Sequence, residues 1–411
     1  MTTAPSLEEF ERALEVVHRI TQRTPLESSR YLAEVIGVPN VYMKCENLQR
    51  TGAYKLRGAY NRLLQLSDEE RSRGVVAASA GNHAQGVAFA ARELGIKATI
   101  FMPAGVALPK LQATRNYGAE VVLEGATFDE TNRAAQAFVE ENEAIFIPPF
   151  DHPAVIIGQG TVALEMLETQ PEIETMIVPI GGGGLISGVA VAAKKHAERA
   201  GRSIHIIGVQ AENAAAFTPS LDVGRPVTIE THPTIADGIA VARPGDLTFE
   251  LVRDYVDEIV TVSDDDIARA IVMLLERAKL VVEPAGAVGV AAILAGKVRA
   301  KGITATILSG GNIDPLLLQR VIGHGLAASA RYLKLRILLP DVPGQLVRTA
   351  SIVAGQNANV VEVNHTRHAT ELPVSQVELE LHIETRGHEH GEAVAQALRD
   401  AGYAVRVGER Y

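Results

Sequence analysis

The stretch that decides the fold is "TMIVPIGGGGLISGVAVA", Thr175–Ala192, in which an apolar strand runs through four successive glycines into a helix. The N–H groups of these glycines carry no obstructing Cβ, and with a helix N-terminus at Leu185 they form a pocket for a phosphate. A dinucleotide-binding Gly-x-Gly-x-x-Gly loop is excluded, because Ile186 or Ser187 stands at the third glycine position. A Walker loop is excluded because no Gly-Lys-Ser/Thr follows. A phosphate cradle of another kind is favoured over a merely structural turn.

The surrounding sequence repeats this alternation of strand and helix. From about residue 40 to 325, short apolar runs such as "GVVAAS", "KATIFM" and "ITATIL" alternate with helical patterns. Strands that are apolar throughout belong to parallel sheets covered on both faces. The sequence therefore predicts an α/β architecture with two open sheets. Ligands bind such sheets at the carboxyl ends of the strands, in the loops before the helices.

One of these loops carries a lysine where a helix begins, in "NLQRTGAYKLRGAY", Asn47–Tyr60. A helix N-terminus carries partial positive charge and disfavours a cation, so Lys55 is an unusual choice there. Lys55 is either an ordinary solvated lysine or an amine whose lowered pKa lets it attack a carbonyl.

Two further loops supply small and polar residues. "VVAASAGNHAQGVAFA" places Ser79, Gly81, Asn82 and His83 between a strand and a helix, where free N–H groups suit a carboxylate. The alternative is an ordinary N-cap by Ser79 or Asn82, and His83 alone fits a structural role better than that of a base.

The third loop is "TILSGGNID", in which Ser309 is expected to end a strand. Gly310 and Gly311 allow a ligand to approach the backbone closely. A plain strand-to-helix turn is the alternative here.

Composition narrows the class of protein. The chain has 411 residues, 47% of them hydrophobic, and a net charge of −10, so nucleic acid is not an expected partner. Cys45 is the only cysteine, which excludes an intrachain disulfide, and its apolar neighbours predict a buried inert thiol.

Ser6 and Glu9 have capping-box spacing at a first amphipathic helix. With no signal peptide and no membrane span in the sequence, we expect a soluble, cytoplasmic protein.

The pattern changes after residue 330. Strand, helix, two strands, helix and strand follow one another in "YLKLRILL", "GQLVRTASIVAGQ", "ANVVEVNHTR", "SQVELELHIET", "HGEAVAQALRDAG" and "YAVRV". This order, with strict alternation in "VELELHI", predicts a ferredoxin-like βαββαβ module. We place the boundary near Ser329, giving domains 1–328 and 329–411.

Taken together, these motifs resemble a known family. "NLQRTGAYKLRGA", "SAGNHAQGVA", "GQGTVALE", "PIGGGGLISG", "VVEPAGA" and "SGGN" are similar, in order, to those of the fold-type II pyridoxal-phosphate enzymes. Within them the nearest resemblance is to the threonine ammonia-lyases (threonine dehydratases), from about Thr24 to Gly325. It implies a tryptophan synthase β-like catalytic region, in which a small α/β subdomain, about 53–157, is inserted in the large one.

The resemblance also implies roles for particular residues. Lys55 resembles the lysine that binds pyridoxal 5'-phosphate covalently, and Ser309 the residue that faces the ring nitrogen. Asn82 matches the residue that hydrogen-bonds the ring oxygen, and Tyr54 stands where the family often has phenylalanine. The phosphate-binding loop corresponds to Gly181, Gly182, Gly183, Gly184 and Leu185. The loop that receives the substrate carboxylate corresponds to Ser79, Ala80, Gly81, Asn82 and His83.

The implied reaction is β-elimination of the hydroxyl of L-threonine, with L-serine as a secondary substrate, giving 2-oxobutanoate and ammonia. Lys55 would be nucleophile and base, and a neutral Ser309 suits elimination because it cannot keep the ring nitrogen protonated. Ala80 replaces the second serine of serine racemases, so racemisation should be weak. Gln210 and Ala216 stand where those racemases hold a divalent cation, so no metal site is expected.

The tail resembles an ACT domain through "LLPDVPGQL" and "NANVVEVNH". It implies a regulated enzyme of the first step of isoleucine biosynthesis, with isoleucine or valine as effector and a homodimer or homotetramer as the assembly. An ACT module that serves only assembly is the alternative for the tail. For the whole chain, the alternatives are a serine- or hydroxyaspartate-specific dehydratase or racemase, and an inactive amino-acid-sensing regulator.

Overall fold

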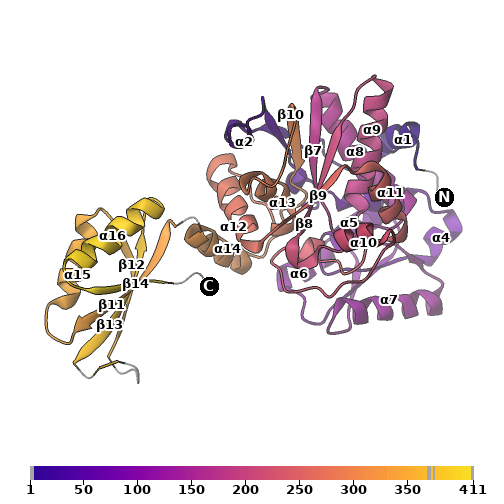
Figure 1. Cartoon of the computed structure of the whole chain (residues 1–411). Coiled ribbons are helices and arrows are strands. Elements are labelled where there is room, and N and C mark those ends of the chain that lie inside the picture. The colour runs from indigo at the N-terminus through magenta and orange to yellow at the C-terminus, as the bar shows by residue number, and fades with distance from the viewer. Residues whose placement is uncertain (1–3, 329, 368–371, 374, 409–411) are drawn as a thin grey trace. The chain divides into compact units, whose positions relative to one another are not determined.

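The computed structural model describes residues 4–328, 330–367, 372–373 and 375–408. The chain divides into two compact units, Met1–Pro315 and Leu316–Tyr411, coloured from indigo to orange and from orange to yellow in Figure 1. The division falls at the start of α14 (Pro315–Ala328), whereas the sequence placed the boundary near Ser329, which lies outside the described residues. No helix in the described part of the chain has the length and apolar character needed to cross a membrane.

A six-stranded sheet forms the centre of the first unit. Its strands, in order across the sheet, are β1 (Leu26–Ser28), β2 (Val41–Lys44), β10 (Ile303–Ile307), β7 (Ile173–Pro179), β8 (His205–Ala211) and β9 (Glu258–Val262). All neighbouring strands are parallel except β1, which runs antiparallel to β2. The parallel arrangement predicted for the apolar strands between about residues 40 and 325 is confirmed, whereas β1 precedes that region and was not predicted. The segment "LES" is too short and too polar to show the apolar pattern of the other strands.

Helices cover both faces of this sheet, as the apolar strands predicted. Met176 and Val178 of β7 pack with α9 (Gly184–Arg199) in the main hydrophobic core, while Ile177 between them faces Gly289 of α13 (Pro284–Leu294). The helices of the large part of the unit are α1 (Leu7–Val17), α2 (Arg30–Ile36), α8 (Pro153–Thr169), α9 (Gly184–Arg199), α10 (Phe217–Val223), α11 (Asp246–Tyr255), α12 (Asp264–Met273) and α13 (Pro284–Leu294).

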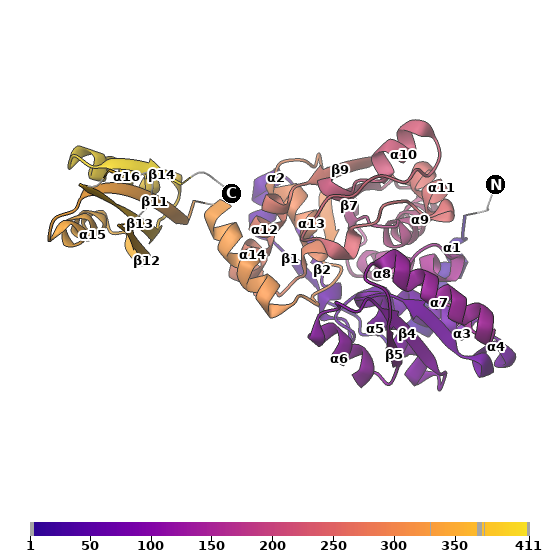
Figure 2. The same cartoon turned by 90° about the horizontal axis from the view of Figure 1, so that it is seen from below.

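A four-stranded parallel sheet is built from the chain between β2 and β7 (Figure 2). Its strands, in order, are β5 (Glu120–Leu123), β4 (Ala98–Met102), β3 (Val75–Ala78) and β6 (Ile145–Phe146). Alternate residues of β3 face different cores. Val75 and Ala77 belong to the core that includes α5 (Asn82–Glu93), and Val76 and Ala78 belong to the core that includes α7 (Phe128–Asn142). The helices of this part are α3 (Lys55–Leu64), α4 (Asp68–Arg73), α5 (Asn82–Glu93), α6 (Leu108–Asn116) and α7 (Phe128–Asn142).

The second unit contains the predicted βαββαβ order. Its elements after α14 are β11 (Tyr332–Pro340), α15 (Gln345–Gly355), β12 (Asn359–Thr366), β13 (Gln376–Glu384), α16 (His388–Asp400) and β14 (Ala404–Val407). The strands form one antiparallel sheet in the order β12-β13-β11-β14. Val377, Leu379, Leu381 and Ile383 of β13 alternate into a core shared with α15 and α16, so the strict alternation of "VELELHI" is confirmed.

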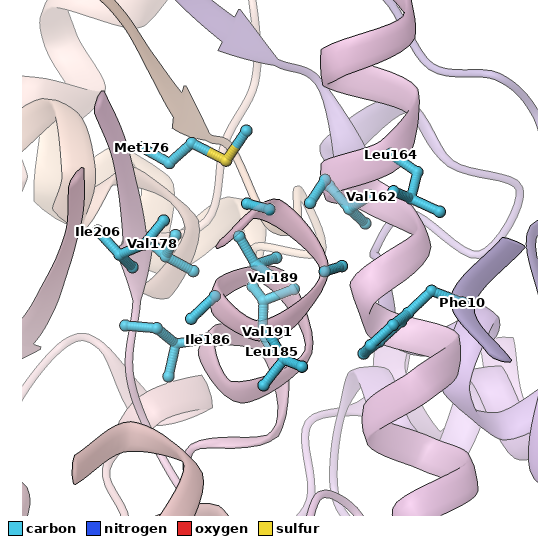
Figure 3. Packing of buried hydrophobic residues seen from close by; sticks show 14 of the residues in the cluster. Phe10, Val162, Leu164, Met176, Val178, Leu185, Ile186, Val189, Val191 and Ile206 are labelled. Carbon is cyan, nitrogen blue, oxygen red and sulfur yellow. The ribbon is translucent and has the colours of Figure 1, made fainter. Parts of the chain in front are cut away.

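The N-terminal helix α1 closes the main core of the first unit. Ser6 caps α1 by accepting from the Glu9 N–H (3.3 Å), and Glu9 Oε2 accepts from the Ser6 N–H (2.7 Å), so the predicted capping box is confirmed. Figure 3 shows the Phe10 ring of α1 lying against α8, with the apolar side chains of α9, β7 and β8 beyond it.

Helices α8 and α9 approach each other through glycines. A Cβ at Gly188 of α9 would lie 2.3 Å from the Ile156 carbonyl oxygen and 2.6 Å from the Gly160 nitrogen, both on α8. Backbone atoms cannot move aside as a flexible side chain can. This contact therefore fixes the helix that carries the four-glycine loop at its start.

We expect Gly188→Ala to lower the free energy of unfolding by about 1–3 kcal/mol, because the added methyl overpacks the α8–α9 contact. Thermal and urea denaturation measure the change. Gly323→Ala is the matched control, since Gly323 lies in α14 with open space at its Cβ position. Equal melting temperatures for Gly188→Ala and the unmodified protein would contradict the close contact.

Candidate active site

Lys55 is the first residue of α3, as the sequence predicted. The preceding residues pair with the loop after β10: Ala53 forms a bridge with Gly310, and the Tyr54 N–H donates to the Ser309 carbonyl (3.1 Å). This pairing brings Lys55 and Ser309 together at the carboxyl end of a central strand. Ser309 is itself buried.

The Lys55 amine lies in a desolvated place. It donates to the Pro149 carbonyl (2.8 Å) and lies 5.3 Å from the centroid of the Tyr54 ring. Although the side chain keeps some accessible surface, protein atoms surround the amine, and this burial lowers the pKa of Lys55 to about 8 while the charge of Glu283 opposes the change. A large share of the amine is therefore neutral near pH 8, which a nucleophile or a base requires.

The four-glycine loop joins β7 to α9. Gly183 has a φ of 97° and is the N-cap of α9, which begins at Gly184, one residue before the predicted start. Among the described residues, no acceptor bonds the N–H groups of Gly181 to Leu185, although the loop is largely buried. Buried N–H groups at a helix N-terminus call for an anionic partner, so the loop fits a phosphate.

Neighbouring residues hold this loop in place, and the sequence analysis missed them. A Cβ at Gly182 would lie 2.4 Å from the ring of Phe150, which directly follows the Pro149 that binds Lys55. Thr248 Oγ1 donates to the Gly182 carbonyl (2.7 Å). Asp151 accepts from the N–H groups of Asp246 and Thr248 (3.0 and 3.1 Å) at the start of α11. The segment 149–151 thus links the amine to the glycine loop.

The loop before α5 begins at the end of β3. Gly81 is the N-cap of α5 without a side-chain capping bond, so neither Ser79 nor Asn82 is the cap, and Ser79 Oγ accepts from the Gly81 N–H (3.2 Å). His83 is buried and its Nε2 bonds the Ile147 carbonyl (2.8 Å), while burial lowers its pKa to about 3. A neutral, internally bonded imidazole agrees with the structural role expected for His83. Ala80, in the same loop, has no hydroxyl group.

Asn82 belongs to a polar chain that the sequence analysis did not predict. Its Nδ2 donates to Glu283 (2.6 Å), and its Oδ1 accepts from Asn312 (2.8 Å). Glu283 and Asn312 come from "VVEPAGA" and "SGGN", both quoted as family motifs, so the signal was present without an assigned role. Burial, followed by the charge of Asp237, raises the pKa of Glu283 to about 7.

A cluster of buried charges is centred on Arg57, which lies two residues after Lys55 on α3. Arg57 donates bidentately to Glu46 (2.8 and 2.8 Å) and bidentately to Glu165 (2.6 and 2.9 Å). Lys44 donates to Glu165 as well (2.6 Å), and all four side chains are at most 1% exposed. The cluster ties α3 to β2, to the 3₁₀ turn η1 (Glu46–Leu48) and to α8.

Two residues considered in the sequence analysis have structural roles here. Burial raises the pKa of Cys45 to about 12, as expected for an inert thiol. Gln210 is buried, and its Oε1 accepts from the Phe217 N–H (3.2 Å), so it supports the turn before α10.

Comparisons with known proteins identify the family to which this chain is similar. The family described as "Pyridoxal-phosphate dependent enzyme" matches residues 17–310. An L-threonine ammonia-lyase of Thermotoga maritima is 49% identical over 98% of this chain and 99% of its own. The structure of threonine deaminase isoform 2 from Solanum lycopersicum is 39% identical with a TM-score of 0.72, covering 79% of this chain and 95% of that one. Maize serine racemase is 37% identical with a TM-score of 0.73, covering 79% and 99%.

We expect Glu165→Gln to destabilise the protein at pH 7 by about 3 kcal/mol, because it leaves Arg57 and Lys44 incompletely paired in the interior. Burial alone would raise the pKa of Glu165, but Arg57 and Lys44 outweigh it and hold the pKa at about 2. The depressed value stabilises the fold above the unfolded pKa of 4.5, and this stabilisation is lost as the pH falls through about 2.

The difference in unfolding free energy between the unmodified protein and Glu165→Gln should therefore shrink as the pH falls from 5 toward 2. Urea denaturation at a series of pH values measures it. Glu168→Gln on the same helix is the control, because Glu168 is exposed and pairs with the exposed Arg23. A difference that does not depend on pH would refute the role given to the Glu165 charge.

Proposed function

Since the chain belongs to the family of pyridoxal-phosphate-dependent enzymes, we propose that it is a threonine ammonia-lyase that converts L-threonine to 2-oxobutanoate and ammonia. The observation that carries this proposal is the desolvated amine of Lys55, which segment 149–151 links to an anion-binding glycine loop. The Thermotoga maritima L-threonine ammonia-lyase and the Solanum lycopersicum threonine deaminase support the substrate. L-Serine, which lacks one methyl group, is the expected secondary substrate.

The residues at the site fit the cofactor. Gly181 to Leu185 offer largely buried N–H groups, which no acceptor in the described residues bonds, for its phosphate, and the Lys55 amine is available for covalent attachment. Asn82 would hydrogen-bond the ring oxygen, Tyr54 would pack beside the ring, and Ser309 would face the ring nitrogen. When bound, pyridoxal 5'-phosphate withdraws electrons from the substrate Cα and so acidifies its proton.

Lys55 then removes the Cα proton in its neutral form, and its lowered pKa keeps that form available near neutral pH. The Pro149 carbonyl orients the amine. The substrate carboxylate would lie against the N-terminus of α5, within the loop of Ser79, Ala80, Gly81, Asn82 and His83. Ser309 is a neutral partner, which suits elimination, because the leaving hydroxyl relieves the developing negative charge.

A racemase is the second candidate, and the similarity to maize serine racemase favours it. Racemisation needs a second proton donor on the opposite side of the substrate Cα. Ala80 has no side chain capable of this, so the lyase is preferred. A dehydratase specific for serine or hydroxyaspartate differs only in pocket shape, and product analysis distinguishes it.

The C-terminal unit is proposed to be an ACT domain that regulates a cytoplasmic enzyme of isoleucine biosynthesis. Its four-stranded antiparallel sheet with two helices in βαββαβ order supports this. Isoleucine or valine is the proposed effector, and a homodimer or homotetramer the proposed assembly. Domains of 1–328 and 329–411 remain our proposed division by function.

We expect the purified protein to release 2-oxobutanoate from L-threonine and Lys55→Ala to reduce that rate at least a thousandfold, because one side chain serves as covalent anchor and base. A coupled assay for 2-oxo acids measures the rate. Lys97→Ala is the control: it alters an exposed lysine that directly precedes β4 and should retain the full rate. If the protein binds the yellow cofactor but forms no product from threonine, the assignment of threonine as substrate is wrong, and serine and hydroxyaspartate should be tested next.

A further inference from the structure

A chain of three hydrogen bonds joins four loops of the site. Glu283 accepts from Asn82 Nδ2 (2.6 Å), Asn82 Oδ1 accepts from Asn312 Nδ2 (2.8 Å), and Asn312 Nδ2 also donates to the Thr51 carbonyl (2.8 Å). These residues come from the start of α13, the start of α5, the loop after β10 and the loop before α3. These hydrogen bonds therefore connect the start of α13 to three segments to which the proposed function assigns cofactor contacts: the start of α5, the loop after β10 and the loop before α3.

This arrangement allows one orientation of the Asn82 amide. Both hydrogens of Asn312 Nδ2 are used, one of them on Asn82, so the oxygen of Asn82 must face Asn312. Its nitrogen then faces Glu283, whose carboxylate can only accept. One hydrogen of Asn82 Nδ2 bonds Glu283, and the other has no acceptor among the residues that the structure describes.

Glu283 is buried, and its neighbours fix its position. Its side chain is 6% exposed, its N–H donates to the Gly310 carbonyl (3.0 Å), and a Cβ at Gly310 would lie 2.2 Å from Glu283 Oε1. Within the described chain, no cation lies at ion-pair distance from the carboxylate. A buried carboxylate that is bonded to a neutral amide and has no ion pair is costly for a protein to keep, which points to a role in the site.

The titratable groups that interact electrostatically with Glu283 come from three elements. Tyr54 and Lys55 belong to the start of α3, Lys110 to α6, and Asp237 to the 3₁₀ turn η3 (Asp237–Ile239). Asp237 disfavours the ionised carboxylate, whereas Lys110 and Lys55 favour it. Lys110 and Asp237 also pair with each other (2.8 Å).

We propose that Glu283 is a positioning residue of this site: its ionised carboxylate fixes the Asn82 amide so that the free N–H, and never the oxygen, is presented to the bound cofactor. The proposal rests on the proposed function for the identity of that cofactor. Protonation of Glu283 removes the charge-assisted hydrogen bond and loosens Asn82. The surroundings of the cofactor ring therefore change with the ionisation of Glu283.

Burial raises the pKa of Glu283 to about 7, so its charge is present above neutral pH and lost below it. We expect the visible absorbance spectrum of the full-length holoenzyme, without substrate, to change with a midpoint near pH 7. Glu283→Gln should abolish this transition, and Glu283→Asp should retain it. With threonine, Glu283→Gln should lower kcat about tenfold or more while KM changes less.

Two surface variants test the same proposal without altering Glu283. Asp237→Asn should move the spectroscopic midpoint to lower pH, because it removes an anion that disfavours ionisation. Lys110→Met should move the midpoint to higher pH, because it removes a favourable cation. These variants keep the proposal testable if Glu283→Gln does not fold, which thermal denaturation would show.

An unchanged midpoint in folded Glu283→Gln would overturn the proposal, and so would the absence of opposite shifts in the two surface variants. A structural role alone would lower the melting temperature without moving a spectroscopic midpoint. A protein that binds no cofactor and shows no visible band would contradict the proposed function itself. The two failures are therefore distinguishable.

Discussion

The site depends on the buried ion cluster around Arg57. Arg57 and Lys44 carry two positive charges, and Glu46 and Glu165 two negative charges, so the cluster is neutral overall. Buried charges are tolerated only when each is paired and hydrogen-bonded, which demands fixed positions for all four side chains. Because Arg57 lies two residues after Lys55 on α3, the cluster also fixes the start of that helix. The position of the reactive amine follows from this constraint.

The reactivity of the Lys55 amine depends on the position in which the ion cluster holds it. Lys55 lies at a helix N-terminus and within protein, and both conditions disfavour a charged ammonium. The carboxyl ends of parallel strands bring the other loops to the same edge. The glycine loop after β7 offers N–H groups, the loop after β3 offers Asn82, and the loop after β10 offers Ser309. Charged, polar and backbone groups thus converge although they lie far apart in the sequence.

Several features of the fold and of the site could be predicted from sequence because their signals are local. Four glycines between an apolar strand and a helix predict an anion-binding loop, and "LEEF" after Ser6 predicts a capping box. The loop's supports were not predictable in this way. Asp151 and Thr248 look like ordinary polar loop residues, and only the fold brings them together at the start of α11, where Thr248 also holds Gly182. The edge strand β1 was missed because three residues are too few to show a period.

The sequence by itself determined which segments are strands and helices, their order, and the placement of the candidate loops at strand ends, because periodicity and turn residues act over short distances. It also carried the family motifs that name a cofactor. Only the tertiary structure decided which ionisable groups are buried and with what partners. Arg57 and Glu165 lie 108 residues apart, and Asn82 and Glu283 lie 201 apart. Burial, and the pKa shifts that it causes, depends on packing between such distant segments, so no local pattern could reveal it.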